Sequence, residues 1–147
     1  MKRLRLYLLF FAILAVSTPV RAEITGKPRV IDGDTFEIGG QVIRLYGIDA
    51  PAEDETCTAN GKPWNCGLEA GFALAFETAE HWVRCEEKGT DKDGTVLAVC
   101  FVGPYDLNAL MVRKGWARAE RSVSTDYVGQ EEGARAARKG IWRGSRR

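Results

Sequence analysis

Residues 35–48, TFEIGGQVIRLYGI, give the clearest indication of the fold. Gly39-Gly40 separates two runs in which side chains alternate between the two faces of a strand. This is the pattern of a β-hairpin closed by a two-residue turn. Another strand is predicted just before it, from Lys27 to Ile31. The sequence therefore predicts a β-meander with strands at residues 27–31, 35–38 and 41–48.

Beyond the meander, the apolar period changes to that of a helix. From Leu68 onward, apolar residues recur at spacings of three and four: Leu68, Phe72, Ala75, Phe76, Ala79 and Val83. A hairpin of residues 81–86 and 95–102 is predicted around the turn signal DKDG at 91–94. A second helix is expected to begin at Asp106 as N-cap and end at Gly115, and a third to run from Asp126 to Gly140. This order predicts an α+β, mainly β fold, namely a five-stranded OB-type barrel with three helices.

The first 22 residues have the composition of a secretory signal peptide. Basic residues precede an apolar run from Leu6 to Val16, and small residues precede a cleavage point at Glu23. The run is too short to span a bilayer, although a retained anchor is the alternative interpretation. We expect residues 23–147 to form one exported domain, periplasmic or secreted, that is monomeric and free of membrane segments.

Charge is unevenly distributed over residues 23–147. Without the leader the chain has 17 basic and 20 acidic residues, a net charge of −3. The part from Glu23 to Val112 holds 7 basic and 16 acidic residues, whereas Arg113 to Arg147 holds 10 basic and 4 acidic residues. The acidic part can hold cations. The basic part either follows a phosphate backbone or is a solvated helix face.

Four cysteines in a chain directed to an oxidising compartment favour disulfides. A hairpin centred on residues 91–94 places Cys85 directly opposite Cys100, close enough to be bridged. Cys57 and Cys66 are then left to close a short loop. A zinc site is the alternative, but the spacings lack paired C-x-x-C knuckles.

Candidate chemistry concentrates in VIDGDT at 30–35 and IRLYGIDAP at 43–51. Three aspartates and one arginine in a chain with a single histidine indicate an oxygen-ligand site for calcium or magnesium, facing a phosphate held by the arginine. A plain turn is the alternative for Asp-Gly-Asp. His81 is assigned to packing or to the surface, so we predict no histidine-based triad or zinc centre.

Five motifs in order carry a family resemblance: VIDGDT, IRLYGIDAP, DKDG, DLNALMVRKGWA and GIW. From about Thr25 to Trp142 the chain resembles the staphylococcal nuclease (thermonuclease) family. The resemblance implies an OB-type barrel that uses one Ca²⁺ ion to cleave phosphodiesters of DNA and RNA. It also implies roles for individual residues: metal carboxylates at Asp34 and Asp49, a carbonyl ligand at Ala50, a nearby carboxylate at Asp32 and a phosphate arginine at Arg44.

The chain departs from the family pattern at catalytic positions. The family has a glutamate, which positions or deprotonates the attacking water, directly after the D-x-P proline, and here that residue is Ala52. The arginine of the family's D-x-Y-G-R pattern is replaced by Thr95, and the family's nucleotide-contacting tyrosines fall on the non-aromatic residues 120–123. Losing a base typically costs ~10² to 10⁴ in rate, and losing a charge-stabilising donor roughly 10² to 10³. We therefore expect impaired or absent catalysis.

Other residues are candidates for compensation. Glu53 is a candidate substitute base, and Lys92 or Arg84 a candidate donor of charge. Lys92 and Arg121 are the candidate nucleic-acid contacts.

Two competing motifs are excluded. The sequence DKDGTV imitates the D-x-D-G-T signature of haloacid-dehalogenase-type phosphatases, but residues 85–90 are charged and the chain is too short for a doubly wound sheet. An EF-hand fails because its later ligands are missing. Three hypotheses remain: an active exported nuclease with a relocated base, a degenerate binding module and a secreted interaction domain.

Overall fold

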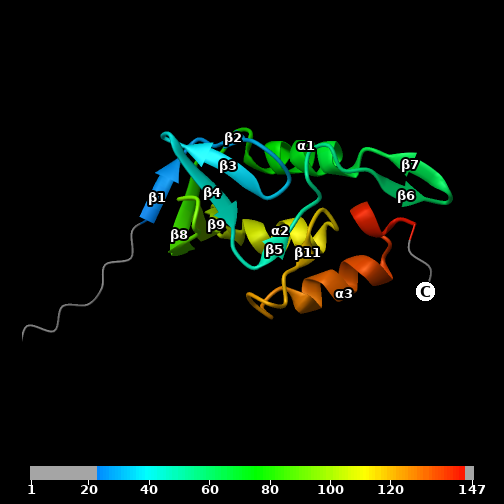
Figure 1. The fold of residues 1–147 in the computed structure, drawn as a ribbon. Coiled ribbons are helices and arrows are strands. Elements are labelled where there is room, and N and C mark those ends of the chain that lie inside the picture. The colour runs from blue at the N-terminus through cyan, green and yellow to red at the C-terminus, as the bar shows by residue number, and fades with distance from the viewer. Residues whose placement is uncertain (1–22, 145–147) are drawn as a thin grey trace, which may run out of the picture.

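The computed structural model describes residues 23–144, so the predicted signal peptide lies outside the described residues. A curled, mixed sheet of seven strands has the order β1-β8-β9-β4-β3-β2, with β10 on β9. Its strands are β1 (Glu23–Gly26), β2 (Arg29–Val30), β3 (Thr35–Ile38), β4 (Gln41–Leu45), β8 (Val83–Thr90), β9 (Val96–Val102) and β10 (Tyr105–Asp106). Figure 1 shows α1 on one side of the molecule and α3 on the opposite side. This mainly β half-barrel with three helices confirms the predicted OB-type fold.

The predicted meander forms, with corrections at both ends. Its first strand, predicted from Lys27 to Ile31, is only β2 (Arg29–Val30). Gly39 and Gly40 both have positive φ, 59° and 83°, as a tight hairpin turn requires. The third strand was predicted to continue to Ile48, but β4 ends at Leu45 because Gly47 turns the chain at φ 76°. The next residues form β5 (Ile48–Asp49), which leaves the main sheet and pairs with β11 (Arg118–Ala119).

The predicted hairpin register and both disulfides are confirmed. Cys85 lies opposite Cys100 in the β8–β9 pair, and the two are bonded. Cys57 and Cys66 form the second disulfide. A β-bulge between Glu87 and Gly89 shifts the register by one residue near the turn, which the sequence did not predict.

Three α-helices and one 3₁₀-helix follow in the predicted order: α1 (Cys66–Thr78), α2 (Leu107–Arg113), α3 (Val128–Ala136) and η1 (Gly140–Trp142). Asp106 caps α2 as predicted, since its side chain accepts a hydrogen bond from the Ala109 amide at 2.9 Å. The helix predicted from Asp126 to Gly140 is shorter and stops before Gly140, where η1 begins.

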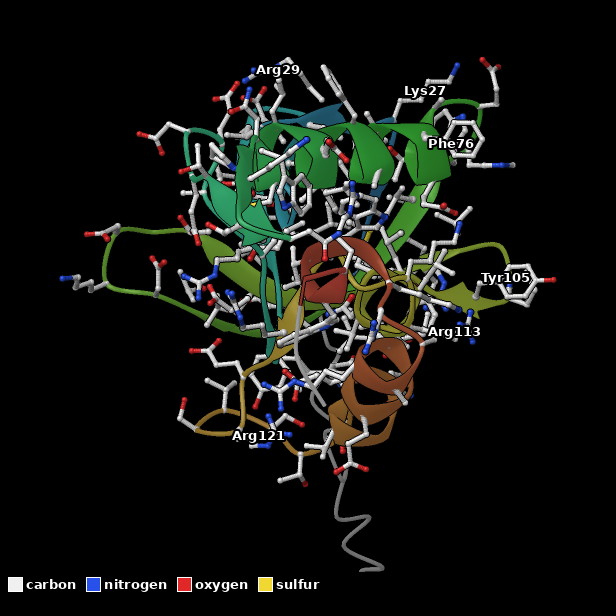
Figure 2. All side chains as sticks on the ribbon, turned by 90° about the vertical axis from the view of Figure 1, so that its right-hand side faces the viewer. Lys27, Arg29, Phe76, Tyr105, Arg113 and Arg121 are labelled. Atoms are coloured by element: carbon white, nitrogen blue, oxygen red, sulfur yellow. A yellow bond between two sulfur atoms is a disulfide. The ribbon has the colours of Figure 1, made fainter. Side chains whose placement is uncertain are left out.

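The apolar stripe that predicted α1 lies on its outer face. Leu74 and Ala70 are fully buried, whereas Phe72 and Phe76 are largely exposed. Figure 2 shows Phe76 pointing away from the body of the molecule. The helix also ends at Thr78, so His81 is an exposed residue after the helix rather than within it.

One further hairpin, formed by β6 and β7, was not predicted. Strands β6 (Cys57–Ala59) and β7 (Lys62–Trp64) are joined by Asn60-Gly61, both with positive φ. The Asn-Gly pair is a strong hairpin signal, so the sequence did contain this information. Among the described residues, no helix is long and apolar enough to cross a membrane.

Candidate functional site

The turn between β2 and β3 carries two of the candidate metal carboxylates. Oδ1 of Asp32 accepts a hydrogen bond from the Asp34 amide at 3.0 Å, which closes the turn. Gly33 stands at its centre, where an added Cβ would lie 2.7 Å from the Ala70 Cβ and 2.8 Å from the Ala50 Cβ. The turn is therefore held between α1 and the segment after β5, and only glycine fits there.

Asp34 is buried, with 6% of its surface exposed. Its carboxylate accepts hydrogen bonds from the Ala50 amide at 2.7 Å and from the Thr35 hydroxyl at 2.8 Å. Burial raises the pKa of Asp34 to about 6, and the charge of Asp32 adds to the rise, although these two hydrogen bonds and Arg44 oppose it. A cation bound here would stabilise the ionised form that burial disfavours. The residue thus fits the chemistry of a hard-cation ligand.

Asp49 and Ala50 lie beside this turn on a different segment. Asp49 lies opposite Arg118 in the register of strands β5 and β11. Its side chain is exposed, whereas that of Ile48 is buried. The Ala50 amide is the group that ties this segment to Asp34. The structure therefore brings Ala50, the candidate carbonyl ligand, next to Asp34, whereas the side chain of Asp49 is exposed to solvent.

The aspartates do not form a closed ligand shell. Within residues 23–144, only Glu55, Cys57 and Cys66 bring three possible ligand atoms within 4.8 Å of one another. Both of these cysteines are in a disulfide, so they offer no thiolate. Calcium accepts carbonyl and water oxygens beside one or two carboxylates, so the aspartate site fits a partly hydrated ion rather than a protein-only cage.

Arg44, on β4, lines a hollow of about 160 Å³, called here the Arg44 hollow. The lining residues are Arg44, Leu45, Tyr46, Gly47, Asp91, Leu97, Glu120 and Val123. The Arg44 Nη2 lies 3.6 Å from the Glu120 Oε2, so the guanidinium forms an ion pair inside the hollow. Sequence reasoning missed this contact, because it depends on the two-residue β5–β11 pairing that places residue 120 beside Gly47.

The loop after Pro51 holds Ala52 firmly. The Glu55 amide donates to the Ala52 carbonyl at 2.8 Å, and the Glu55 carboxylate accepts from the Ala52 amide at 3.2 Å. The start of α1 packs against this turn so closely that a Cβ on Gly67 would lie 1.6 Å from the Ala52 carbonyl oxygen. The turn and the helix together leave this loop little freedom to shift by one residue.

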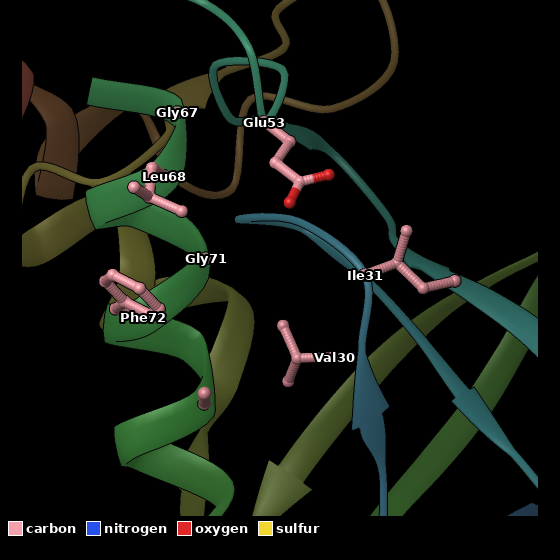
Figure 3. Close-up of a pocket in the computed structure, with 8 residues that line it drawn as sticks. Val30, Ile31, Glu53, Gly67, Leu68, Gly71 and Phe72 are labelled. Carbon is pink, nitrogen blue, oxygen red and sulfur yellow. The ribbon is translucent and has the colours of Figure 1, made fainter. Parts of the chain in front are cut away.

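Glu53, the candidate substitute base, lines a different hollow. This space of about 210 Å³ lies between α1 and the end of β2, and its other lining residues are Val30, Ile31, Gly67, Leu68, Gly71, Phe72 and Ala75. Figure 3 shows the Glu53 carboxylate between Ile31 and the helix. None of these residues also lines the Arg44 hollow. The structure therefore places Glu53 and Arg44 in separate hollows.

The β8–β9 turn carries Lys92 and Thr95. Oδ1 of Asp91 accepts hydrogen bonds from the amides of Asp93 and Thr95 at 2.8 and 3.0 Å, which fixes the turn. Lys92 is exposed at its tip. Thr95 lines a third hollow together with residues of the β3–β4 turn, so it does not face Arg44 in a shared hollow.

The remaining basic candidates are engaged elsewhere. Arg84 pairs with Glu86 at 2.7 Å and stacks over the Phe101 ring. Arg121 lies 2.6 Å from the buried carboxylate of Glu131, and Figure 2 shows it at the end of the molecule opposite α1. Neither lines the Arg44 hollow, so the structure does not gather these cations around one phosphate.

Comparisons with known proteins agree with this geometry. A family model described as "Staphylococcal nuclease homologue" matches residues 42–144. The chain is 36% identical over 125 residues to the succinoglycan biosynthesis protein ExoI of Rhizobium meliloti strain 1021, covering 82% of this chain and 65% of that protein. It is 34% identical over 110 residues to a thermonuclease of Staphylococcus intermedius, covering 71% and 64% of the two chains.

A third relative is an uncharacterized endonuclease of Haemophilus influenzae strain Rd, 30% identical over 121 residues, with 78% of this chain and 63% of that protein covered. The chain thus spans just under two thirds of the length of these three relatives. The names of these relatives differ, since two refer to nucleases and one to succinoglycan biosynthesis.

Proposed function

The chain belongs to the staphylococcal nuclease family, and we propose that it is an exported protein that binds calcium and phosphodiesters but hydrolyses the phosphodiesters slowly or not at all. Asp34 and Asp49 would hold the ion, with the Ala50 carbonyl as a further ligand and Asp32 nearby. Arg44 would hold a phosphate. Calcium bound there would neutralise the phosphate charge, and the guanidinium would donate hydrogen bonds to two phosphate oxygens in a bidentate contact.

The proposed loss of catalysis is supported mainly by the fixed loop at Ala52. A methyl group cannot accept a proton from water, and the turn from Ala52 to Glu55 is held by two hydrogen bonds and by the contact with Gly67. A one-residue shift that would bring Glu53 into the position of residue 52 would have to break this turn. Removal of a positioned base costs ~10² to 10⁴ in rate.

The test is hydrolysis of single-stranded DNA by the purified protein, with calcium or with chelator. We expect calcium-dependent binding of the oligonucleotide with hydrolysis near background. The double variant Ala52→Glu/Thr95→Arg should hydrolyse the strand at least ~10²-fold faster, because it restores both the base and the second cation. Asp49→Ala, placed in that double variant, should remove the calcium-dependent gain.

The same assay separates the two alternatives. Calcium-dependent hydrolysis by the unaltered protein, lost in Glu53→Gln but not in Asp54→Asn, would identify an active nuclease with a relocated base. An absence of both calcium and oligonucleotide binding would contradict the proposal and favour a secreted interaction domain.

A further inference from the structure

The phosphate arginine of this protein already has an anionic partner. Oε2 of Glu120 lies 3.6 Å from Nη2 of Arg44, and both side chains line the Arg44 hollow. At this distance the contact is an ion pair rather than a hydrogen bond. Both side chains remain partly exposed, so an external anion can reach the pair.

The backbone holds Glu120 at this place. Its amide donates to the Gly47 carbonyl at 2.9 Å, which extends the β5–β11 pairing by one residue. Its carbonyl accepts from the amides of Val123 and Ser124 at 2.9 and 3.0 Å. The Tyr46 hydroxyl donates to the Val123 carbonyl and anchors the following turn. The carboxylate therefore starts from a fixed backbone position beside Arg44.

The charge balance of the Arg44 hollow opposes an incoming anion. Arg44 is the only basic residue in its lining, whereas Asp91 and Glu120 are both acidic. One oxygen of Asp91 is occupied by the backbone of its own turn, so Glu120 is the carboxylate that faces Arg44. A phosphate oxygen approaching Arg44 would meet the Glu120 charge at close range, where like charges repel.

We propose that Glu120 is an internal competitor for phosphate and sets the affinity of the Arg44 hollow. Its carboxylate occupies the side of the guanidinium that a phosphate oxygen would use, and a phosphodiester binds only by displacing it. A lone phosphate has only Arg44 to offset this cost, whereas a strand has further contacts. The site therefore favours a polymer of phosphodiesters over a single phosphate, which binds weakly. This inference rests on the proposed function for the role of Arg44.

Glu37 provides a matched control. It pairs with Arg29 between β2 and β3, and its side chain is 30% exposed, against 31% for Glu120. It does not line the Arg44 hollow. Glu120→Gln and Glu37→Gln change the net charge equally, and each breaks one ion pair of an equally exposed carboxylate. The control pair is the closer of the two, at 2.5 Å against 3.6 Å, and its arginine is 69% exposed against 39% for Arg44.

The first measurement is a titration with inorganic phosphate without calcium, followed by NMR at the Arg44 Nε–H resonance. We expect Glu120→Gln to lower the phosphate concentration at half-shift by about two- to fivefold, the upper part of the range expected when competition from an exposed ion pair is removed. Glu37→Gln should shift it by less than about twofold. Equal responses in the two variants would overturn the proposal.

The second measurement is anisotropy with a labelled single-stranded oligonucleotide in calcium. Glu120→Gln should tighten binding by a similar factor, and this gain should vanish in an Arg44→Gln background. A gain that persists without Arg44 would overturn the proposal, as would calcium-dependent cleavage that Glu120→Gln abolishes, which would make Glu120 the missing base. If phosphate responds as expected but no variant binds the oligonucleotide, the proposed function fails and the competitor role stands.

Discussion

Asp34 shows how one buried carboxylate links the stability of the fold to pH and, under the proposed function, to calcium. Its carboxylate is buried, and among the residues the structure describes it has hydrogen bonds but no ion pair. Because the pKa is raised to about 6 from 3.8, the folded protein binds this proton more tightly than the unfolded chain does. Below about pH 4 this carboxyl is neutral in both states and costs the fold no stability. As the pH rises from about 4 to about 6 the ion-free fold loses stability, and above about pH 6 it carries the full cost of the buried charge.

Replacing Asp34 with asparagine should stabilise the calcium-free protein at pH 8 by about 1–2 kcal/mol. A rise of about two pKa units corresponds to about 3 kcal/mol. The asparagine amide has only one acceptor oxygen, so it loses one of the two hydrogen bonds of Asp34, and this loss reduces the gain. At pH 4 the gain should disappear, because Asp34 is then neutral. Urea unfolding with chelator at both pH values measures this, with Asp54→Asn as an exposed control. Equal destabilisation at both pH values would contradict the burial argument. Calcium should stabilise only the unaltered protein.

At the residue scale, the sequence motifs predicted that Asp34 and Ala50 lie close together. The two motifs placed Asp34 and Ala50 in segments that the fold joins by a hydrogen bond. The Arg44–Glu120 contact could not be predicted, because residue 120 lies beside Arg44 only through a backbone hydrogen bond to Gly47, far away in sequence. Pairings this short leave no periodic pattern in the chain.

At the scale of elements, α1 shows why periodicity identified a helix but not its buried face. Both faces are apolar, and the larger side chains lie outside. The inner face must be small because it touches the turn at Gly33 and the carbonyl of Ala52, where Ala70 and Gly67 are in close contact. Side-chain size therefore pointed to the wrong face, and only the neighbouring turns decide the orientation.

This orientation predicts opposite responses on the two faces of α1. Leu74→Ala should destabilise the protein by about 2–5 kcal/mol, because it opens a cavity under the helix. Phe76→Ala should change the free energy of unfolding by no more than about 0.5 kcal/mol, since Phe76 is 79% exposed. Guanidinium unfolding of both variants measures the difference. A larger loss at Phe76 would mean that this outer face is covered in solution.

At the scale of the whole molecule, local periodicity and turn residues predicted the order of the elements, and the register of one hairpin predicted the Cys85–Cys100 bond. The attachment of the C-terminal segment was not predictable in the same way. η1 packs against the start of α1, and the Ile141 amide donates to the Gly115 carbonyl at 2.8 Å. Gly115 lies just after the end of α2. Its backbone is in close contact with that of Gly140, which is distant in sequence.

This contact makes Gly115 a test of how the C-terminal segment is held. Its φ is 80°, and a Cβ there would lie 2.4 Å from the Lys139 carbonyl oxygen. Gly94 has nearly the same φ, 85°, with nothing within 4 Å of an added Cβ. Gly94→Ala should therefore cost only about 1–2 kcal/mol for the left-handed backbone, whereas Gly115→Ala should cost about 3 kcal/mol or more.

Guanidinium unfolding measures both costs, and trypsin digestion reports whether the segment detaches. Gly115→Ala should expose the bonds after Arg138 and Lys139 to cleavage under native conditions, because the clash displaces η1 from α2 while the sheet remains folded. Gly94→Ala, at the tip of the β8–β9 turn, should leave this cleavage unchanged. Equal stability losses and equal cleavage in the two variants would mean that backbone strain alone acts at Gly115, and that the C-terminal segment is not held by the contact between Gly115 and Gly140.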